Sequence, residues 1–318
     1  MNFSSQSVRV LLLGASGFIG GHVLQALLRS GFQVTALRRK RPPRLGSEPW
    51  RVAEQSGQLV WRQAEVHHMR ASQDWLPWLQ GVHAVINCVG ILRQRLGESY
   101  EDVHHHMPAA LASACAVNGV RFIHTSALGL YEGAASRFLS SKWRGEQALM
   151  QSAADFCIVR PSLIDGAGGF GAAWLRMLSS WPVHWVPRGA TGRISALTAA
   201  DLGQAYAALV AMPSFEQQRE ANLGGIRQFD YGEYLQLLRG VEEGARRPAL
   251  QITMPNWLTR LGAHGCDVLR FSPFSFGHWL LLQRDNLAVP NHLPGLLGRD
   301  PAPVGYLGGS EFGRVRMS

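Results

Sequence analysis

Long apolar runs and paired cysteines are both missing from this chain of 318 residues. No uncharged apolar stretch reaches the roughly 18 residues needed to cross a bilayer, so the sequence predicts no membrane-spanning helix. The four cysteines are widely spaced and show no metal-binding or redox pairing. Such scattered thiols are typical of a reducing compartment, so we expect a cytoplasmic protein with no metal site. Peripheral attachment to the inner face of a membrane is the alternative.

Lysine is also scarce, and this shapes the charge of the chain. Only Lys40 and Lys142 occur, so arginine supplies nearly all the positive charge behind the net value of +9. Outside residues 38–44 the arginines form no long stripe, and no nucleic-acid-binding motif is present. We therefore expect no nucleic-acid partner. An anionic small molecule or a membrane surface accounts for the sign of the charge equally well.

Three glycines punctuate the segment after the first apolar run, residues 8–13, and before a predicted helix. In this Gly-x-x-Gly-x-x-Gly pattern the first glycine permits a tight turn, and the second lets the backbone approach a pyrophosphate. The third lets the predicted helix pack against the strand. The N-terminus of that helix then faces the phosphates. The pattern predicts a dinucleotide-binding site. The residues that we expect to contact the cofactor here are Gly14, Ser16, Gly17, Phe18, Ile19 and Gly20.

Strand and helix signals alternate through the first half of the chain. This rhythm indicates an α/β fold, a doubly wound parallel Rossmann sheet with helices on both faces. The cofactor then lies at the carboxyl ends of the strands. We assign residues 1–165 to an NAD(P)-binding Rossmann domain. The predicted strands are residues 8–13, 32–37, 58–62, 82–87, 121–125 and 156–160.

The pattern loosens in residues 166–318. We expect this mixed segment to complete part of the sheet and to form a smaller C-terminal substrate or partner lobe. Gly, Pro and Trp are dense in residues 166–192, which predicts a loop-rich segment near the site. Two capping-box patterns, Thr198-x-x-Asp201 and Asp230-x-x-Glu233, predict helices that start just after them.

Residues 254–283 are rich in Trp, Phe and Leu and poor in charge. The segment is either the core of the lobe or a docking face for a membrane or a protein partner. The run His104-His105-His106 suggests a metal cluster at first sight. Consecutive helical residues point in different directions, however, so we interpret it as the start of a helix, with His104 facing the cofactor pocket as an alternative.

The end of the second predicted strand carries no acid. NAD-preferring folds place an Asp or Glu there, which hydrogen-bonds the ribose 2′-hydroxyl. Here the strand ends in Arg38-Arg39-Lys40-Arg41, and a guanidinium can bind a 2′-phosphate through a bidentate, charge-assisted pair. A solvated basic loop is the alternative. We favour NADP(H) over NAD(H), with Arg38 as the first candidate and Arg39 as the second.

These motifs resemble the short-chain dehydrogenase/reductase superfamily, in its extended or atypical branch. The glycine pattern matches its phosphate loop, and Asn87-Cys88-Val89-Gly90 matches its small-residue motif beside the adenine-ribose. Arg160-Pro161-Ser162 resembles the segment that borders the nicotinamide. Glu65 lies where the superfamily usually keeps an Asp near the adenine. The resemblance therefore implies further cofactor contacts by Glu65, Cys88, Val89, Gly90, Pro161 and Ser162.

Further segments are most similar to one atypical subgroup of this superfamily. That subgroup includes the Rossmann-type accessory subunit of respiratory complex I and its bacterial relatives. The segments are residues 103–104, 123–129, 141–146 and 223–225.

The catalytic pattern of the superfamily is incomplete in this chain. Active members use a Tyr-x-x-x-Lys pair, in which the tyrosine is the acid/base and the lysine lowers its pKa and holds the ribose. Here the matching residues are Phe138 and Lys142, and phenylalanine has no proton to give. The position of the superfamily's serine falls on Ala127, with Ser126 one residue earlier. The catalytic candidates are therefore Lys142, Ser126 and Tyr131, and Lys142 is also expected to contact the cofactor.

Two classes of function follow from these residues. The first is an NAD(P)H-binding reductase of a carbonyl-type substrate with a degraded triad, its substrate not identified by the sequence. The second is a catalytically silent NADP(H)-binding structural, assembly or redox-sensing factor. A nucleotide-sugar epimerase or dehydratase comes third, because it depends most on the missing tyrosine.

Overall fold

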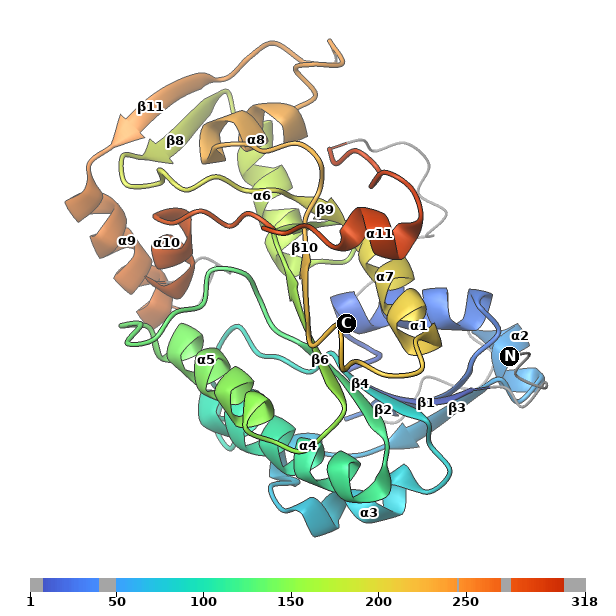
Figure 1. Cartoon of the computed structure of the whole chain (residues 1–318). Helices are drawn as coiled ribbons and strands as arrows, with labels where there is room; N and C mark the ends of the chain where they lie inside the picture. The colour runs from blue at the N-terminus through green and yellow to red at the C-terminus, as the bar shows by residue number, and fades with distance from the viewer. Residues whose placement is uncertain (1–7, 40–49, 245, 270–275, 306–318) are drawn as a thin grey trace.

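The computed structural model describes residues 8–39, 50–244, 246–269 and 276–305. Within them, parallel strands form a seven-stranded sheet in the order β10-β6-β5-β4-β1-β2-β3 (Figure 1). This order confirms the doubly wound α/β fold with a parallel Rossmann sheet. Lys40 and Arg41 lie outside the described residues. The strands are β1 (Arg9–Leu13), β2 (Gln33–Arg38), β3 (Leu59–Gln63), β4 (Ala84–Asn87), β5 (Arg121–Thr125), β6 (Phe156–Pro161) and β10 (Glu220–Leu223).

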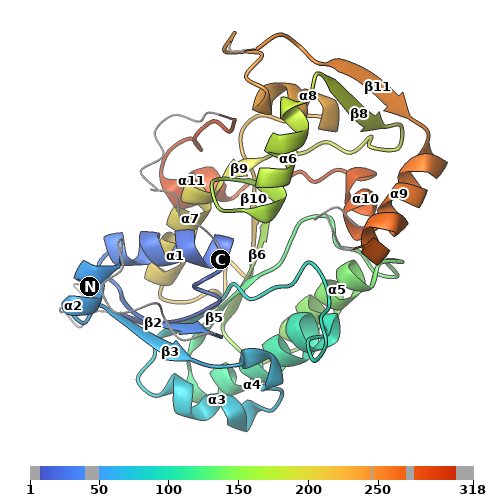
Figure 2. The same cartoon turned by 180° about the vertical axis from the view of Figure 1, so that it is seen from behind.

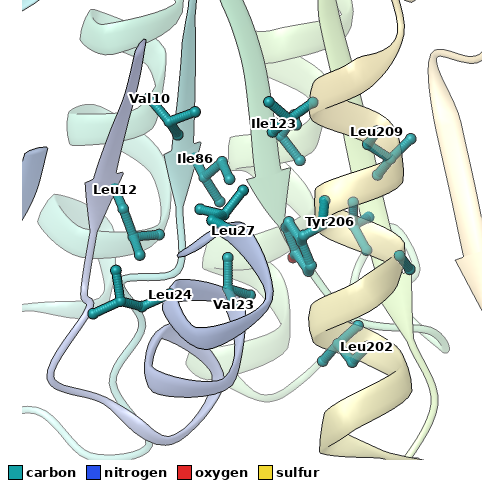
Figure 3. Packing of buried hydrophobic residues seen from close by; sticks show 14 of the residues in the cluster. Val10, Leu12, Val23, Leu24, Leu27, Ile86, Ile123, Leu202, Tyr206 and Leu209 are labelled. Carbon is teal, nitrogen blue, oxygen red and sulfur yellow. The ribbon is translucent and has the colours of Figure 1, made fainter. Parts of the chain in front are cut away.

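The sheet is buried on both faces because its strands are apolar on both sides. Along β1, Val10 and Leu12 belong to one buried cluster, and Leu11 and Leu13 belong to the other. This alternation follows from the period of two in a strand. Figure 3 shows the first cluster, in which side chains of β1, β4 and β5 meet those of α1 and α7.

Helices cover the two faces of the sheet (Figure 2). The α1 and α7 helices pack closely, because a Cβ at Gly203 would lie only 2.6 Å from the backbone oxygen of His22. One face is covered by α1 (Phe18–Arg29), α7 (Ala199–Ala211) and α11 (Leu293–Leu297). The other face is covered by α3 (Ser72–Leu79), α4 (Met107–Asn118) and α5 (Arg137–Met150). A short helix, α2 (Arg51–Gln55), precedes β3.

The second half of the chain contributes to the sheet and also builds a smaller lobe above it (Figure 1). The division at residue 165 stays a prediction, since β10 and α7 come from beyond it and pack with the first half. The lobe contains β8 (Val183–Pro187) paired with β11 (Leu250–Met254), and β7 (Ile164–Asp165) paired with β9 (Leu197–Thr198).

The predicted loop-rich segment at 166–192 is wrong for its middle part. α6 (Phe170–Ser180) lies there, and it packs against α8 (Tyr231–Leu238). Ala172, Leu175 and Ser179 form its inner face at helical spacing. The glycine and tryptophan content of the segment concealed this periodicity.

Both predicted caps are present, one of them in part. The Asp230 carboxylate accepts a hydrogen bond from Glu233 N at 2.7 Å, and the Glu233 carboxylate accepts one from Asp230 N at 2.8 Å, which completes the capping box. Thr198 Oγ1 accepts from Asp201 N at 3.0 Å, but the Asp201 carboxylate pairs with Arg299 instead of the Thr198 backbone.

Residues 254–283 are buried in one helix and exposed in another, and the docking face stays a prediction. In α10 (Phe276–Leu282), Trp279 is buried, as expected for a lobe core. In α9 (Asn256–Leu269), Trp257 and Leu261 are exposed. Among the described residues, no helix has both the length and the hydropathy of a membrane span.

Candidate functional site

The glycine-rich turn between β1 and α1 forms the first part of the site. Gly14 has a φ of +77°, a left-handed conformation that glycine adopts readily. A Cβ at Gly14 would lie 2.9 Å from the backbone carbonyl of Cys88. A Cβ at Gly20 would lie 2.1 Å from the Gly14 oxygen. Both glycines are therefore required by close backbone approaches, one to the loop after β4 and the other within the turn.

The first turn of α1 is open to an anion. In the described structure its N-cap, Gly17, makes no side-chain cap, and its first turn carries no acid. Ser16 and Gly17 are exposed. The first N–H groups of the helix therefore remain available for phosphate oxygens. These residues fit the pyrophosphate of a dinucleotide.

Phe18 and Ile19 are partly buried at the start of α1. The Phe18 ring packs against the loop after β7, where a Cβ at Gly169 would lie 2.9 Å from it. Ile19 packs against the core between α1 and the sheet. The structure thus gives both side chains packing partners beside the phosphate-binding turn.

The loop after β4 lies beside that turn. Asn87 is buried, and its side-chain oxygen accepts a hydrogen bond from Val89 N at 3.0 Å. Cys88 N donates to the Leu13 carbonyl, and Gly90 is exposed. Burial raises the pKa of the Cys88 thiol to about 12, so this cysteine stays protonated and is a poor nucleophile.

The ends of β2 and β3 hold the residues expected at the adenosine. The Arg38 guanidinium lies over the Trp61 ring, 5.0 Å from its centroid. Its Nε is buried and has no hydrogen-bond partner in the described structure. Arg39 is paired with Glu98, with Nη1 of Arg39 2.9 Å from Oε1 of Glu98. Glu65 follows β3, is exposed, and lies 3.7 Å from His68.

Lys142 and Phe138 lie on the same face of α5. Nζ of Lys142 is 5.8 Å from the centroid of the Phe138 ring. Burial lowers the pKa of the Lys142 ammonium to about 8, although Glu146 acts in the opposite direction. A lysine with this pKa is protonated at neutral pH and still able to give up its proton.

Phe138 occupies the position of the superfamily's tyrosine as a packed apolar ring. It makes edge contacts with Tyr100 and His104, at 5.7 and 5.5 Å between centroids, and stacks on His278 at 5.7 Å. The ring is nearly inaccessible to solvent. Packing of the helix, and not proton transfer, is what this side chain provides.

Ser126 and Tyr131 follow β5. Ser126 is buried, and in the described structure its hydroxyl has no hydrogen-bond partner. A buried hydroxyl of this kind normally finds a partner, so it is suited to a ligand oxygen. Tyr131 packs with Phe138 in one cluster, and Arg284 lies 3.8 Å above its ring.

Pro161 ends β6 and Ser162 directly follows it, and both residues are buried. The Ser162 hydroxyl donates toward the backbone oxygen and the side-chain oxygen of Asn286, both at 2.7 Å. Asn286 in turn donates to the Leu128 carbonyl at 3.1 Å. This hydroxyl therefore fastens the segment after α10 to the carboxyl ends of β5 and β6.

Comparison with known proteins assigns this part of the chain to a family. Residues 14–171 match a family model described as NAD(P)H-binding. These residues belong to the NAD(P)H-binding family. The match begins at the first glycine of the phosphate-binding turn, directly after β1, and includes β2 to β6 with α5.

Relatives that align over more than three quarters of the chain include two kinds of protein. The ceramide reductase of Caulobacter vibrioides is 27% identical over 256 residues, which are 79% of this chain and 75% of that protein. Subunit 9 of the mitochondrial NADH dehydrogenase (ubiquinone) 1 alpha subcomplex of Dictyostelium discoideum is 26% identical over 247 residues. That alignment covers 77% of this chain and 66% of the subunit, and the Arabidopsis thaliana subunit is covered over 58% of its length. The predicted resemblance to the complex I accessory subgroup is confirmed.

Solved structures support the fold. A nucleoside-diphosphate-sugar epimerase from Staphylococcus aureus superposes with a TM-score of 0.68 at 18% identity, over 94% of this chain and 98% of that chain. The UDP-glucuronic acid 4-epimerase from Bacillus cereus, solved with UDP-glucuronic acid and NAD, gives 0.62 at 18% identity. That superposition covers 93% of this chain and 95% of the other. At these identities the likeness establishes the fold and nothing finer.

The histidine run of the NAD(P)H-binding domain forms a π-helical turn before α4, at Asp102–His106. His105 bonds to Glu101 and His106 to Asp102, each at 3.3 Å. Buried His104 bonds to Ser141 at 3.0 Å.

Hydrogen bonds determine which ring nitrogen of His104 carries the proton. Its Nε2 accepts from Ile91 N at 3.2 Å, so the ring proton is on Nδ1, where Ser141 can accept it. Ser141 in turn donates to the Phe138 carbonyl at 3.0 Å. Burial keeps the pKa of His104 well below its usual value. His104 is therefore a neutral brace between α5 and the loop after β4.

His124 is a site residue of the NAD(P)H-binding domain that the sequence did not identify. It is buried on β5, and its Nδ1 accepts a hydrogen bond from the Asn87 side chain at 3.1 Å. Burial, together with the nearby charge of Lys142, lowers its pKa to about 3. A neutral imidazole with its proton on Nε2 therefore lies close to Lys142. The motif around β5 offered one signal, since a histidine directly follows Phe122 and Ile123 in a predicted strand.

Proposed function

We propose that this protein is an NADP(H)-dependent reductase of a carbonyl-type substrate, in which Lys142 takes the part of the missing tyrosine. The observation that carries the proposal is the lysine itself. It lies one turn after Phe138, at the superfamily's position, with a pKa of about 8 and no tyrosine to assist. The relative named ceramide reductase supports reductase chemistry and favours a carbonyl on a lipid-like molecule.

The residues divide the work of reduction as follows. When bound, the reduced nicotinamide supplies a hydride to the carbonyl carbon of the substrate. The Ser126 hydroxyl, which has no partner in the described structure, donates a hydrogen bond to the carbonyl oxygen. The Lys142 ammonium gives its proton to that oxygen as the C=O double bond becomes a single bond, and water later restores the proton. Tyr131 packs against the cluster that contains Phe138, and it is the second candidate proton donor.

The cofactor contacts that we propose start at the phosphate-binding turn. Gly14, Ser16, Gly17 and Gly20 hold the pyrophosphate, with Phe18 and Ile19 as its neighbours. The remaining contacts are those of Glu65, Cys88, Val89, Gly90, Lys142, Pro161 and Ser162.

The preference for NADP(H) rests on Arg38. Its guanidinium is fixed over Trp61, and its Nε lacks a partner in the described structure, so it can bind a 2′-phosphate.

A second candidate function is a catalytically silent NADP(H)-binding subunit of a larger assembly. Phe138 favours it, because the ring is packed where an acid would have to reach the substrate. The related subunits of NADH dehydrogenase favour it as well.

We also propose that the protein works in the cytoplasm, attached peripherally to the inner face of a membrane through residues 254–283. Trp257, Leu258 and Leu261 are exposed on α9, with the exposed Arg260 among them. Aromatic and leucine side chains beside arginine suit the interface of an anionic bilayer. A lipid-like substrate would reach the protein from the same surface.

One experiment separates the two functions. The purified full chain is given NADPH with aldehydes, ketones, quinones and long-chain keto-lipids, and the nicotinamide absorbance is followed. The reductase proposal expects turnover that Lys142→Met abolishes even at NADPH concentrations that saturate the variant. Tight NADPH binding with no turnover on any acceptor would instead support the silent subunit.

A further inference from the structure

The fold brings an acid to the end of β2, although the sequence has none there. Glu98 lies on the loop between β4 and α4, and its carboxylate is almost fully buried, with 7% of the side chain exposed. Nη1 of Arg39 donates to both of its oxygens, at 2.9 and 3.0 Å. Arg39 directly follows β2, the strand whose end meets the adenosine ribose in dinucleotide-binding folds.

Glu98 is held in place by a tight turn. Arg95 and Glu98 exchange backbone hydrogen bonds of 3.1 and 3.0 Å, and Gly97 between them has a φ of +78°. The side chain of Gln94 accepts from Tyr100 N at 3.0 Å, which ties the base of the turn. The carboxylate is therefore presented to Arg39 by a built loop and not by a freely moving side chain.

This carboxylate can do what an acid at the end of β2 does elsewhere. A carboxylate offers about four acceptor positions, and Nη1 of Arg39 takes one on each oxygen. Counting the hydrogen bonds made by the described residues, each oxygen of Glu98 retains a position for a ribose hydroxyl. In NAD-preferring folds an Asp or Glu accepts a hydrogen bond from the 2′-hydroxyl in this way.

A 2′-phosphate meets opposing charges at the same place. Both hydrogen bonds to Glu98 come from Nη1, so the Nε–Nη2 edge of Arg39 remains for a phosphate, next to Arg38. The phosphate and the Glu98 carboxylate then lie around one guanidinium and repel each other, since like charges across a contact are unfavourable. Arg39 attracts the 2′-phosphate, and Glu98 weakens that attraction.

We propose that Glu98 is a specificity-determining residue for the cofactor. Its carboxylate accepts the 2′-hydroxyl of NAD(H) and opposes the 2′-phosphate of NADP(H), which narrows the preference for NADP(H) set by Arg38 and Arg39. This inference rests on the nucleotide site of the proposed function. It adds that Glu98, on the loop between β4 and α4, modulates the choice between NADP(H) and NAD(H).

The test measures the dissociation constants of NADPH and NADH by titration calorimetry, with the full chain. In Glu98→Gln the affinity for NADPH should rise relative to that for NADH by about tenfold, which corresponds to loss of one like-charge contact. Glu243→Gln removes the same charge at an exposed position beyond α8 and should leave the ratio unchanged. Arg39→Ala should shift the ratio the other way, toward NADH, and it stays informative if Gln at 98 disturbs the turn.

The outcomes separate the two ideas. Opposite shifts in the two variants support the specificity role, because a merely structural role would weaken both nucleotides alike. Parallel changes for NADPH and NADH, or an unchanged ratio in both variants, would overturn the role of Glu98 and leave the proposed function standing. Wild-type protein that binds neither nucleotide would overturn both.

Discussion

In the proposed reductase, Phe138 provides packing and Lys142 provides the proton. A tyrosine and a lysine usually carry out the proton transfer together. The phenylalanine ring makes edge contacts with Tyr100 and His104, stacks on His278 and so packs the start of α5. In the proposed reductase the lysine is the proton donor, and burial lowers its pKa to about 8. Whether the protein is a reductase therefore depends on these two residues.

The pH dependence of turnover tests the role of Lys142. A group that donates a proton is active while protonated, so kcat should be level below pH 8 and fall above it, by about tenfold per pH unit. The ordinary pKa of lysine, 10.5, would place this fall outside the working range. The measurement is the steady-state rate of NADPH oxidation between pH 6 and 10. A level profile across that range would remove Lys142 as the acid.

Restoring the tyrosine tests the degraded triad. In Phe138→Tyr a phenol stands on the same helical face as Lys142, whose charge lowers the pKa of the phenol. We expect kcat to increase by about a hundredfold, the usual contribution of a well-placed acid. Phe138→Leu is the matched control, since it changes the ring without adding a hydroxyl. If the tyrosine variant binds NADPH and reduces no acceptor faster than wild type, the silent-subunit function gains the support.

The predicted site residues differ in how far sequence alone could place them. Phe138 and Lys142 are neighbours by helical spacing, so their shared face could be predicted. Glu98 meets Arg39 across 59 positions of the chain, and His124 meets Asn87 across 37. Such contacts depend on the path of a loop and on the pairing of strands, which no local pattern encodes.

At the scale of elements, the strands and helices of the first half were predictable because their periodicity is strong. Each predicted strand there is present, with small shifts of its ends. α6 was missed because its inward residues are small, Ala172 and Ser179 among them, and so carry little hydrophobic signal. The existence and order of these strands could be predicted, whereas the lobe assembled from later segments could not.

The turn before α1 gives a prediction about backbone packing. A Cβ at Gly20 would lie 2.1 Å from the Gly14 oxygen, whereas one at Gly21 meets only the Ala15 oxygen at 3.8 Å. Gly20→Ala should therefore lower the free energy of unfolding by about 1–3 kcal/mol and weaken NADPH binding. Gly21→Ala, in the same helix, should stabilise by up to about 1 kcal/mol and leave binding intact. Urea unfolding and calorimetric titration measure both; similar behaviour of the two variants would contradict the close approach in this turn.

At the scale of the molecule, the sheet and its helices hold the nucleotide site, and the lobe above carries exposed apolar side chains on α9. The side chains of Trp257 and Leu261 are exposed to solvent. Exposed apolar side chains of this kind are what a lipid-binding surface requires. The double change Trp257→Ser with Leu261→Ser should reduce the fraction that sediments with vesicles of anionic phospholipid, and leave NADPH binding unchanged. Val117→Ser is the control, because Val117 is an exposed valine on α4, on the opposite side of the sheet from α1 and α7. If the double variant sediments as wild type does, α9 is not the attachment surface. A drop in turnover on keto-lipids, but not on short ketones, would show that the same surface delivers the substrate.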